Sequence, residues 1–542
     1  MYYVTTAIPY VNAAPHLGHA LELVQADVLA RHRRLRGQPV RFLTGTDDNA
    51  LKNVTAARAA GVAVAEFVAR NADRFEALRG PLRLSFDDFI RTSTDPRHAA
   101  GVTCLWRRGA AAGDFYRRDY RGRYCPGCEQ FYAPAELIGG RCPEHGVEPE
   151  LVAERNWFFR LSRYAERLRD VLESGQVRVE PAARRNEVLA FVRAGLADVS
   201  VSRPAARAGG WGIPVPGDPS QVVYVWWDAL ANYVTALGYG SDESAYRDWW
   251  VGSAERVHVI GKGIVRFHAV YWLALLLSAG LPLPSTVFVH GYLTVGGAKL
   301  AKSAGNTVSP IELVDRYGAD ALRWWLLREV GPTEDTDFTT RRLVDRANLD
   351  LANGLGNLVN RTLTLAHRYR AGRVGPPRPF AAAAELLGRA ELVGGRDEPL
   401  GAELLGACAA LPGRIDRALG GFDFRAATDA LVAVVDAGNR LVERAQPWRL
   451  ARDEPGNGSS SRNDPSTRND PGTGNGSSTG NGPGGTGLDD VLAVLVHAFR
   501  VLADELSPFL PAGAERLRAQ VGSGGRVAEP VPVFPRLDQR RE

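Results

Sequence analysis

The chain contains 542 residues, of which 45% are hydrophobic and 23% are charged, a composition typical of a globular protein with two or three domains. Its 66 basic and 61 acidic residues give a net charge of +5, which permits a polyanionic partner without requiring one. The N-terminus has no signal-peptide pattern, and the longest apolar stretch, at 270–277, is too short to span a bilayer. We therefore expect a cytoplasmic protein without a membrane partner.

Strands and helices alternate in the first part of the chain. Residues 2–6 are rich in β-branched and aromatic side chains, and 21–36 carry apolar residues at helical spacing. Further strand patterns follow at 40–44, 222–226, 257–260 and 287–289. Since such alternation favours a parallel sheet, we expect a ligand site beyond the carboxyl ends of its strands. Residues 1–115 and 210–337 are expected to form this sheet, with 116–209 inserted between its two halves.

Three of the five cysteines lie in the inserted segment. Cys125 and Cys128 form one tight turn, and Cys142 and His145 form a second turn of the same spacing. Two such turns can place four ligands around one Zn²⁺ with little strain, and four protein ligands leave no open position for catalysis. We therefore expect one structural zinc ion, the alternative being buried thiols without a metal. The two other cysteines are expected to be core residues of helices, Cys104 and Cys408.

From about residue 338 the sequence pattern is purely helical. Helices are predicted at 349–369, 402–419, 426–444 and 488–502. Residues 454–487 are rich in Gly, Asn, Ser, Pro and Asp and contain duplicated strings, which predicts a disordered loop between two helices of one bundle. The helical region is thus expected over 338–510, followed by a C-terminal tail at 511–542.

Histidine and lysine residues indicate a candidate phosphate site. His16 and His19 lie in an HLGH sequence that follows the first strand and opens the first helix. At this spacing both imidazoles face the same side of the first turn, where the helix dipole favours phosphate. The chain uses arginine almost throughout, but Lys299 and Lys302 lie together in a loop of small residues. Since lysine suits a single mobile phosphate oxygen, the two pairs together favour nucleotide chemistry over zinc binding by the histidines.

These motifs resemble those of the methionyl-tRNA synthetases, a family of class I aminoacyl-tRNA synthetases. HLGH at 16–19 resembles the HIGH signature of class I, and KLAKS at 299–303 resembles the KMSKS signature. The cysteine cluster resembles the family's one-knuckle insertion, and further segments match in order, at 2–6, 43–47, 211–218, 225–229, 267–268 and 446–448. The resemblance covers residues 2 to about 510 outside the low-complexity loop, and it outweighs a generic nucleotide-binding α/β protein.

The resemblance implies both the fold and the reaction. The expected fold is an α/β, Rossmann-like parallel sheet split by a zinc-knuckle insertion and followed by an all-α, anticodon-binding helical bundle. The expected reaction joins methionine to the α-phosphate of ATP, with Mg²⁺, and transfers the aminoacyl group to tRNA(Met). Positioning and charge neutralisation dominate such a substitution. The implied catalytic residues are His16, His19, Lys299 and Lys302, and Gly18, Gly261 and Ser303 would also contact ATP.

A methionine pocket is also implied by the resemblance. Asp47 would bind the substrate ammonium, and Arg203 matches a basic residue near the site. The pocket would be lined by Ala7, Ile8, Tyr10, Trp226, Ala229, Leu230, Tyr233 and His268. Aromatic walls suit a thioether, and Tyr233 or His268 could donate to its sulfur. Without the resemblance, the aromatic residues of this set would be interpreted as a core cluster.

The resemblance places the anticodon contacts in the helical region. Trp448 would stack on an unpaired base. Asn357 and Arg361, one helical turn apart, would read base edges, and their alternative is ordinary helix surface.

Three sites depart from the family pattern. Gly263 replaces the aspartate expected at the ATP ribose, residues 47–50 are DDNA instead of DEHG, and Ala301 replaces the serine inside KMSKS. The alternative function is therefore a divergent second copy, either inhibitor-resistant or activating an amino acid for an acceptor other than tRNA. No DNA partner is expected, and a monomer is expected because the tail leaves no room for a further tRNA-binding domain.

Overall fold

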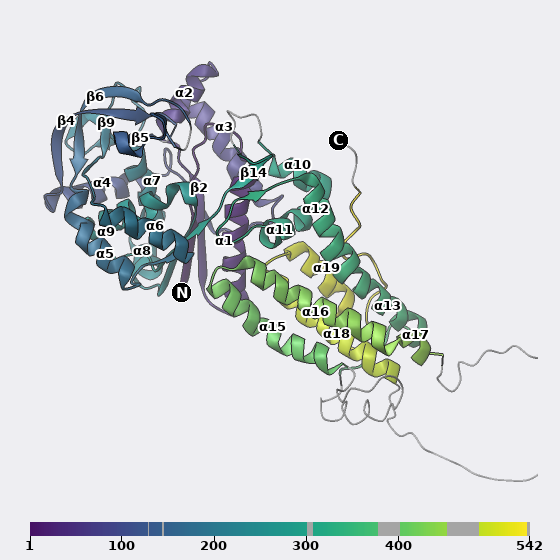
Figure 1. Ribbon diagram of the computed structural model, residues 1–542. Helices are drawn as coiled ribbons and strands as arrows, with labels where there is room; N and C mark the ends of the chain where they lie inside the picture. Colours follow the sequence, from purple (N-terminus) through teal and green to yellow (C-terminus); the bar gives the residue numbers. More distant parts are fainter. Residues whose placement is uncertain (128, 144–145, 301–306, 378–400, 453–486, 539–542) are drawn as a thin grey trace, which may run out of the picture. The chain divides into compact units, whose positions relative to one another are not determined.

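The computed structural model describes the chain except for residues 128, 144–145, 301–306, 378–400, 453–486 and 539–542 (Figure 1). The chain forms two compact units, of which the first comprises residues 1–343, 418–426 and 508–510. The second comprises residues 344–417, 427–507 and 511–542. Within the described residues, no helix is both long and apolar enough to cross a membrane.

A parallel sheet of six strands forms the centre of the first unit, in the order β3-β2-β1-β12-β13-β7. Its strands are β1 (Tyr2–Thr6), β2 (Val40–Thr46), β3 (Asp88–Arg91), β7 (Arg178–Glu180), β12 (Glu255–Gly261) and β13 (Thr286–His290). Every residue of β1 and of β13 is buried, as expected for strands covered on both faces. The strand order reverses between β1 and β12, whose carboxyl ends pair at Thr6 and Val259. This is the position at which parallel sheets bind ligands.

Four of the five strand predictions are confirmed. The fifth, at 222–226, is correct only for its first two residues, because the strand ends at Val223. β11 (Asp218–Val223) ends early and pairs with β9 (Ser202–Pro204) and β10 (Pro214–Val215) in a small antiparallel sheet. From Val225 the chain forms helix α7 (Val225–Thr235), which is buried on nearly all sides. A fully buried helix has no polar face, so its short apolar run cannot be distinguished from a buried strand by periodicity.

Helices of the first unit pack against this sheet. The predicted first helix is confirmed as α1 (Leu17–Leu35), which contacts β1, β2 and β12. Helix α3 (Val64–Glu76) contacts β2. The first unit also contains α2 (Leu51–Ala59), α4 (Pro96–Ala111), α9 (Trp272–Ala279), α10 (Pro310–Tyr317) and α11 (Ala319–Arg328), of which α11 packs on α1. Because α1 lies against the central strands and follows β1 directly, its first turn is placed at the carboxyl edge of the sheet.

One buried arginine joins distant parts of the first unit. Arg323 of α11 has no exposed surface, and its guanidinium pairs with Asp27 of α1 at 2.8 Å. It also donates to the backbone carbonyls of Leu82, Pro508 and Phe509 at 2.7–3.0 Å. A buried charge needs this many partners to offset its lost hydration.

The inserted region contains a second sheet, in the order β5-β4-β6-β8. It is formed by β4 (Phe115–Cys125), β5 (Gln130–Tyr132), β6 (Glu150–Phe159) and β8 (Val199–Ser200), and is accompanied by α5 (Ala165–Glu173) and α6 (Ala182–Arg193). Strand β7, between these helices, instead pairs with β13 at the edge of the main sheet. The sequence pattern did not predict this contribution.

The C-terminal part of the described chain is helical, as predicted. A π-helix (Ala347–Gly356) leads into α13 (Asn357–Arg370), followed by α15 (Ala402–Gly420), α16 (Phe424–Ala445), α17 (Pro447–Leu450) and α18 (Gly487–Glu505). The expected tail begins with a further helix, α19 (Pro511–Val521), which packs on α18 and buries Leu517 and Val521. The loop predicted at 454–487 lies outside the described residues, apart from Gly487.

Candidate active site

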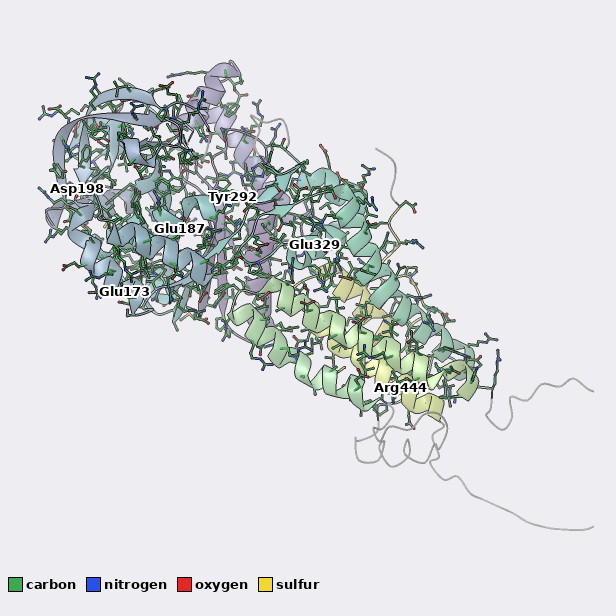
Figure 2. All side chains as sticks on the ribbon, viewed as in Figure 1. Glu173, Glu187, Asp198, Tyr292, Glu329 and Arg444 are labelled. Carbon is green, nitrogen blue, oxygen red and sulfur yellow. The ribbon has the colours of Figure 1, made fainter. Side chains whose placement is uncertain are left out.

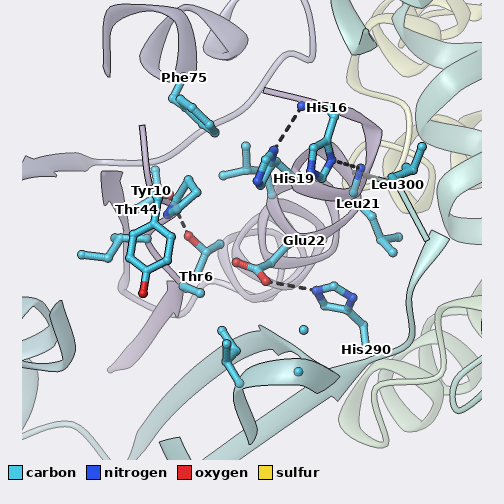
Figure 3. Close-up of a pocket in the computed structure, with 18 of the residues that line it drawn as sticks. Thr6, Tyr10, His16, His19, Leu21, Glu22, Thr44, Phe75, His290 and Leu300 are labelled. Carbon is cyan, nitrogen blue, oxygen red and sulfur yellow. Dashed lines mark hydrogen bonds and ion pairs between the residues drawn. The ribbon is translucent and has the colours of Figure 1, made fainter. Parts of the chain in front are cut away.

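A cavity of about 860 Å³ lies at the carboxyl ends of β1 and β12 (Figure 3). Its walls come from the segment after β1, the start of α1, and the segments after β12 and β13. Of the residues predicted to bind substrates, it brings together Ala7, Ile8, Tyr10, His16, Gly18, His19, Trp226 and Gly261. These residues are far apart in the sequence, so the strand reversal is what assembles the site.

His16 and His19 form the N-terminal cap of α1. The Nδ1 atom of His16 accepts from the Gly18 N–H, and the Nδ1 atom of His19 accepts from the His16 N–H, both at 3.1 Å. The two rings stack with centroids 3.8 Å apart. Because each Nδ1 is an acceptor, the ring proton of the neutral imidazole lies on Nε2. Burial, together with the neighbouring His16, holds the pKa of His19 well below its usual value, so His19 is a neutral donor.

Glu22 was missed in the sequence, although it lines the same cavity. Its Oε2 atom lies 3.0 Å from Nε2 of His290, which also lines the cavity (Figure 3). Burial raises the pKa of Glu22, and the contact with His290 opposes this rise. One signal was available: Glu22 is one turn from His19 on the same face of α1. Its carboxylate lines the cavity together with Gly263, where the family aspartate is absent.

Asp47 lies beside Tyr10, to which it is joined by a β-bridge, and its backbone N–H donates to Pro9 O at 2.9 Å. Its side chain is 1% exposed. Burial and the nearby carboxylate of Asp228 hold the pKa of Asp47 well above its usual value. Among the described residues, neither Oδ1 of Asp47 nor the Tyr10 hydroxyl has a hydrogen-bond partner. A buried acceptor in this state would be stabilised by an incoming cationic donor.

The aromatic residues of the predicted pocket divide into two groups. Trp226 lines the cavity, stacks on Phe267 with centroids 3.7 Å apart, and meets the edge of Tyr10 at 6.2 Å. Tyr233 and His268 do not line the cavity, and the Tyr233 Oη atom lies 2.6 Å from His268 Nε2. Ala229 and Leu230 are buried in α7 and do not line it either.

The donors of Tyr233 and His268 are both used in hydrogen bonds within the protein. Nδ1 of His268 donates to the Ile264 carbonyl at 3.0 Å, and burial lowers the pKa of His268 to about 4. Nε2 is therefore unprotonated and accepts the Tyr233 hydroxyl proton. In this conformation both donors are occupied, contrary to the expectation that either could donate to a thioether sulfur.

Arg203 also lies outside the cavity lining. It is buried in β9, where its guanidinium stands 4.2 Å from the centroid of the Tyr224 ring and donates to Ser200 Oγ and to Ser202 O. The aromatic ring and these two oxygens therefore stabilise the buried charge of Arg203.

Of the lysines, Lys52 contributes to the cavity wall, and Lys262 contacts a residue of that wall. The ammonium of Lys52 lies 5.2 Å from the centroid of the Tyr10 ring. Lys262 donates to both carboxylate oxygens of Asp335, at 2.7 and 2.8 Å, and lies 4.7 Å from the ring of Tyr292, a lining residue labelled in Figure 2. Leu300 also lines the cavity. The backbone of Lys299 pairs with Thr294, but its side chain, Lys302 and Ser303 lie outside the described residues.

Half of the predicted zinc ligands are described. Cys125 and Cys142 are buried in one small cluster with Tyr132, and Cys142 Sγ lies 3.5 Å from the Tyr132 hydroxyl. Cys128 and His145 lie outside the described residues. Within the described part of the chain, no cluster holds three or more metal-ligating side chains.

The predicted anticodon residues lie in the second unit. The Arg361 guanidinium of α13 stands 5.9 Å from the ring of Trp448, which is half-buried in α17. Asn357 and Arg361 are exposed one turn apart on α13. An exposed guanidinium beside an accessible aromatic face is suited to stacking on a base.

Known proteins are similar to this chain over most of its length. The family model described as "tRNA synthetases class I (M)" matches residues 2–149 and 134–363. The methionine–tRNA ligase of Brucella suis is 38% identical over 563 aligned residues that span 100% of this chain and 99% of the relative. That of Mycobacterium tuberculosis strain H37Rv is 42% identical over 462 residues, 84% of each chain.

Solved structures give the same result. The crystal structure of the M. tuberculosis methionyl-tRNA synthetase bound by methionyl-adenylate has a TM-score of 0.84 and 36% identity, covering 98% of this chain and 100% of that one. Its apo form has a TM-score of 0.78 and 33% identity. The chain therefore belongs to the methionyl-tRNA synthetase family of class I aminoacyl-tRNA synthetases.

Proposed function

We propose that the chain is a methionine–tRNA ligase. In the first step a methionine carboxylate oxygen attacks the α-phosphorus of ATP, forming methionyl-adenylate and releasing pyrophosphate. In the second step the adenylate passes its aminoacyl group to tRNA(Met), releasing AMP. The observation that carries this proposal is the stacked His16–His19 pair at the start of α1, in the cavity that also holds Tyr10 and Trp226.

The histidine pair supplies donors for the phosphates. Its Nε2 protons are fixed by the Nδ1 contacts, so no reorientation is needed when negative charge grows on the phosphate oxygens. We propose that Lys299 and Lys302 neutralise the leaving pyrophosphate, with Ser303, Gly18 and Gly261 contacting ATP. Mg²⁺ would accompany ATP and share the charge of its phosphates.

Asp47 is proposed to hold the methionine ammonium. Its buried Oδ1 atom would gain a charge-assisted hydrogen bond, and the positive charge would favour the ionised carboxylate. The methionine side chain would pack among Ala7, Ile8, Tyr10 and Trp226, whose surfaces suit a polarizable thioether. Tyr233, His268, Ala229 and Leu230 would support this wall from behind, and Arg203 would act only through its packing on Tyr224.

The departures from the family pattern do not favour a divergent copy. Asn49 donates to Asp228 Oδ2 at 2.7 Å, and Asp228 in turn pairs with His98, so Asn49 is integrated into a buried network. Glu22 and Gly263 line the same cavity, and we propose that Glu22 takes over the contact with the ribose. Neither an inhibitor-resistant role nor another acceptor is required by the described site. A cytoplasmic monomer without a DNA or membrane partner stays a prediction.

A structural zinc ion is proposed for the insertion. Two thiols brought together in a buried cluster fit a thiolate-rich site, and Cys128 and His145 would complete it. Purified protein is expected to contain one zinc per chain, and Cys142→Ser should lose that metal and melt at a lower temperature. Cys408→Ser, which changes a cysteine buried in α15, should keep the metal. Full zinc content in the Cys142→Ser protein would refute the proposed ligand set.

Trp448 gives the test that separates a tRNA ligase from other amino-acid-activating enzymes. We propose that it stacks on an anticodon base, with Asn357 and Arg361 reading neighbouring base edges. Trp448→Ala is then expected to weaken tRNA recognition by about 1–3 kcal/mol, roughly 5- to 150-fold in kcat/KM for charging. Methionine-dependent ATP–pyrophosphate exchange should stay normal in the same preparation.

Assays of the unmutated protein test the proposed function directly. It should charge tRNA(Met) with methionine and show pyrophosphate exchange with methionine above the other amino acids. Methionine activation without charging of any methionine tRNA would instead indicate another acceptor.

A further inference from the structure

Helix α2 begins without a cap from its own sequence. Its N-cap residue is Ala50, which has the extended backbone of a cap position but no side-chain oxygen. The missing acceptor comes from the insertion: Glu129 Oε1 accepts from the Lys52 N–H at 2.8 Å, across 77 positions of sequence. A carboxylate at the positive end of a helix is favourable, so Glu129 caps α2 from outside.

Glu129 is itself held firmly. It is 3% exposed and adopts a positive φ of 56°, which is uncommon for a residue with a side chain. Its backbone carbonyl accepts from the Tyr224 hydroxyl at 2.7 Å. Tyr224 belongs to a buried cluster with Ala50 and Val225, and Tyr10 and Trp226 of the cavity pack against it. Surrounding packing therefore maintains the backbone conformation that directs the carboxylate to α2.

The first turn of α2 is in turn bonded to Asp47. Asn53, in this turn, has no exposed surface and donates from Nδ2 to the carbonyls of Asp47 and Asp48, at 3.0 and 2.9 Å. Its own N–H donates to Ala50 O at 3.0 Å. The capped turn and the Asp47 loop therefore form one hydrogen-bonded unit.

We propose that Glu129 is a positioning residue for the amino-acid substrate. By capping α2 it fixes the turn that carries Asn53, and Asn53 fixes the backbone that carries the Asp47 carboxylate. This inference rests on the proposed function, in which Asp47 binds the methionine ammonium. The phosphate donors His16 and His19 cap a different helix, so Glu129 acts on methionine and leaves ATP binding unchanged.

Glu129→Ala separates the two substrates. In ATP–pyrophosphate exchange its KM for methionine is expected to rise about three- to tenfold, the usual size of a lost helix cap, while its KM for ATP stays within about twofold. Glu129→Gln keeps an oxygen that can accept from the Lys52 N–H. Its KM for methionine should therefore lie between the values of the unmutated protein and of Glu129→Ala. Glu136→Gln, which changes an exposed carboxylate in the same insertion, is the matched control and should have no effect.

A second substitution tests the capping mechanism. Ala50→Ser in the Glu129→Ala background gives α2 a cap from its own chain and should restore the KM for methionine. The proposal is overturned if the KM values for methionine and ATP rise together, or if Ala50→Ser fails to restore a protein that melts normally. If Glu129→Ala does not fold, an unchanged KM for methionine in Glu129→Gln overturns it. Failure of the proposed function would appear separately, as absent exchange in the unmutated protein.

Discussion

Replacement of His19 by alanine is expected to slow methionine-dependent ATP–pyrophosphate exchange by about 10²–10³-fold. The substitution removes a neutral Nε2–H donor whose direction is set by the contact between His19 Nδ1 and the His16 N–H. It also removes the ring that stacks on His16, so the remaining histidine loses one of the contacts that orient it. Most of the loss should appear in kcat, because the donor acts on charge that develops as pyrophosphate leaves.

His497→Ala is the matched control for this experiment. His497 lies half-buried in α18 of the second unit, and its loss should leave exchange unchanged. Lys302→Ala is expected to show a similar loss of rate, on the basis of its motif. A His19→Ala protein that exchanges pyrophosphate at the unmutated rate would remove the histidine pair from the mechanism.

Asp47→Asn is expected to cause the second large effect, a fall in kcat/KM for methionine. Truncating one partner of a buried charge pair costs about 2–5 kcal/mol, so kcat/KM for methionine should fall about 30-fold or more. Asn keeps the size of the side chain and its carbonyl oxygen, so the loss would measure the charge. Asp119→Asn, at a position 86% exposed on β4, is the control and should behave as the unmutated protein.

The same substitution should stabilise the free protein. Burial and Asp228 raise the pKa of Asp47 in the folded state, so the folded protein binds this proton more tightly than the unfolded chain does. The stability associated with the protonated form is complete below the unfolded pKa and is lost as pH rises through the folded one. At neutral pH, Asp47→Asn removes that cost, and the melting temperature without methionine should rise. A lower melting temperature, or unchanged methionine kinetics, would contradict the assigned role.

Local patterns were sufficient for the elements that build the site. The β-branched and aromatic strand at 2–6, the HLGH cap and the helix after it are each indicated by neighbouring residues of the sequence, and the structure has all three. The pattern failed at 225–235 because a helix buried on all sides lacks the polar face that identifies it. It also missed β7, a three-residue strand at the edge of the sheet.

The rest of the site depends on contacts that no local pattern carries. Glu22 looks like an ordinary surface glutamate in an amphipathic helix until His290 is brought beside it across 268 positions. Glu129 looks like a polar loop residue, although it caps a helix 77 positions away. The sequence could not show that neither Tyr233 nor His268 has a free donor for a sulfur atom. The Ile264 carbonyl accepts from Nδ1 of His268, so Nε2 is left to accept the Tyr233 hydroxyl proton.

The buried contacts of Arg323 have a consequence for folding during synthesis. Asp27 and Arg323 leave the ribosome long before Phe509, which follows Arg323 by 186 positions. At about 5–20 residues per second, roughly 10–40 s pass before the last carbonyl acceptors arrive. Until then the guanidinium must keep water as a partner, so this part of the first unit stays hydrated. Water can leave the surroundings of Arg323 only after most of the second unit has been synthesised.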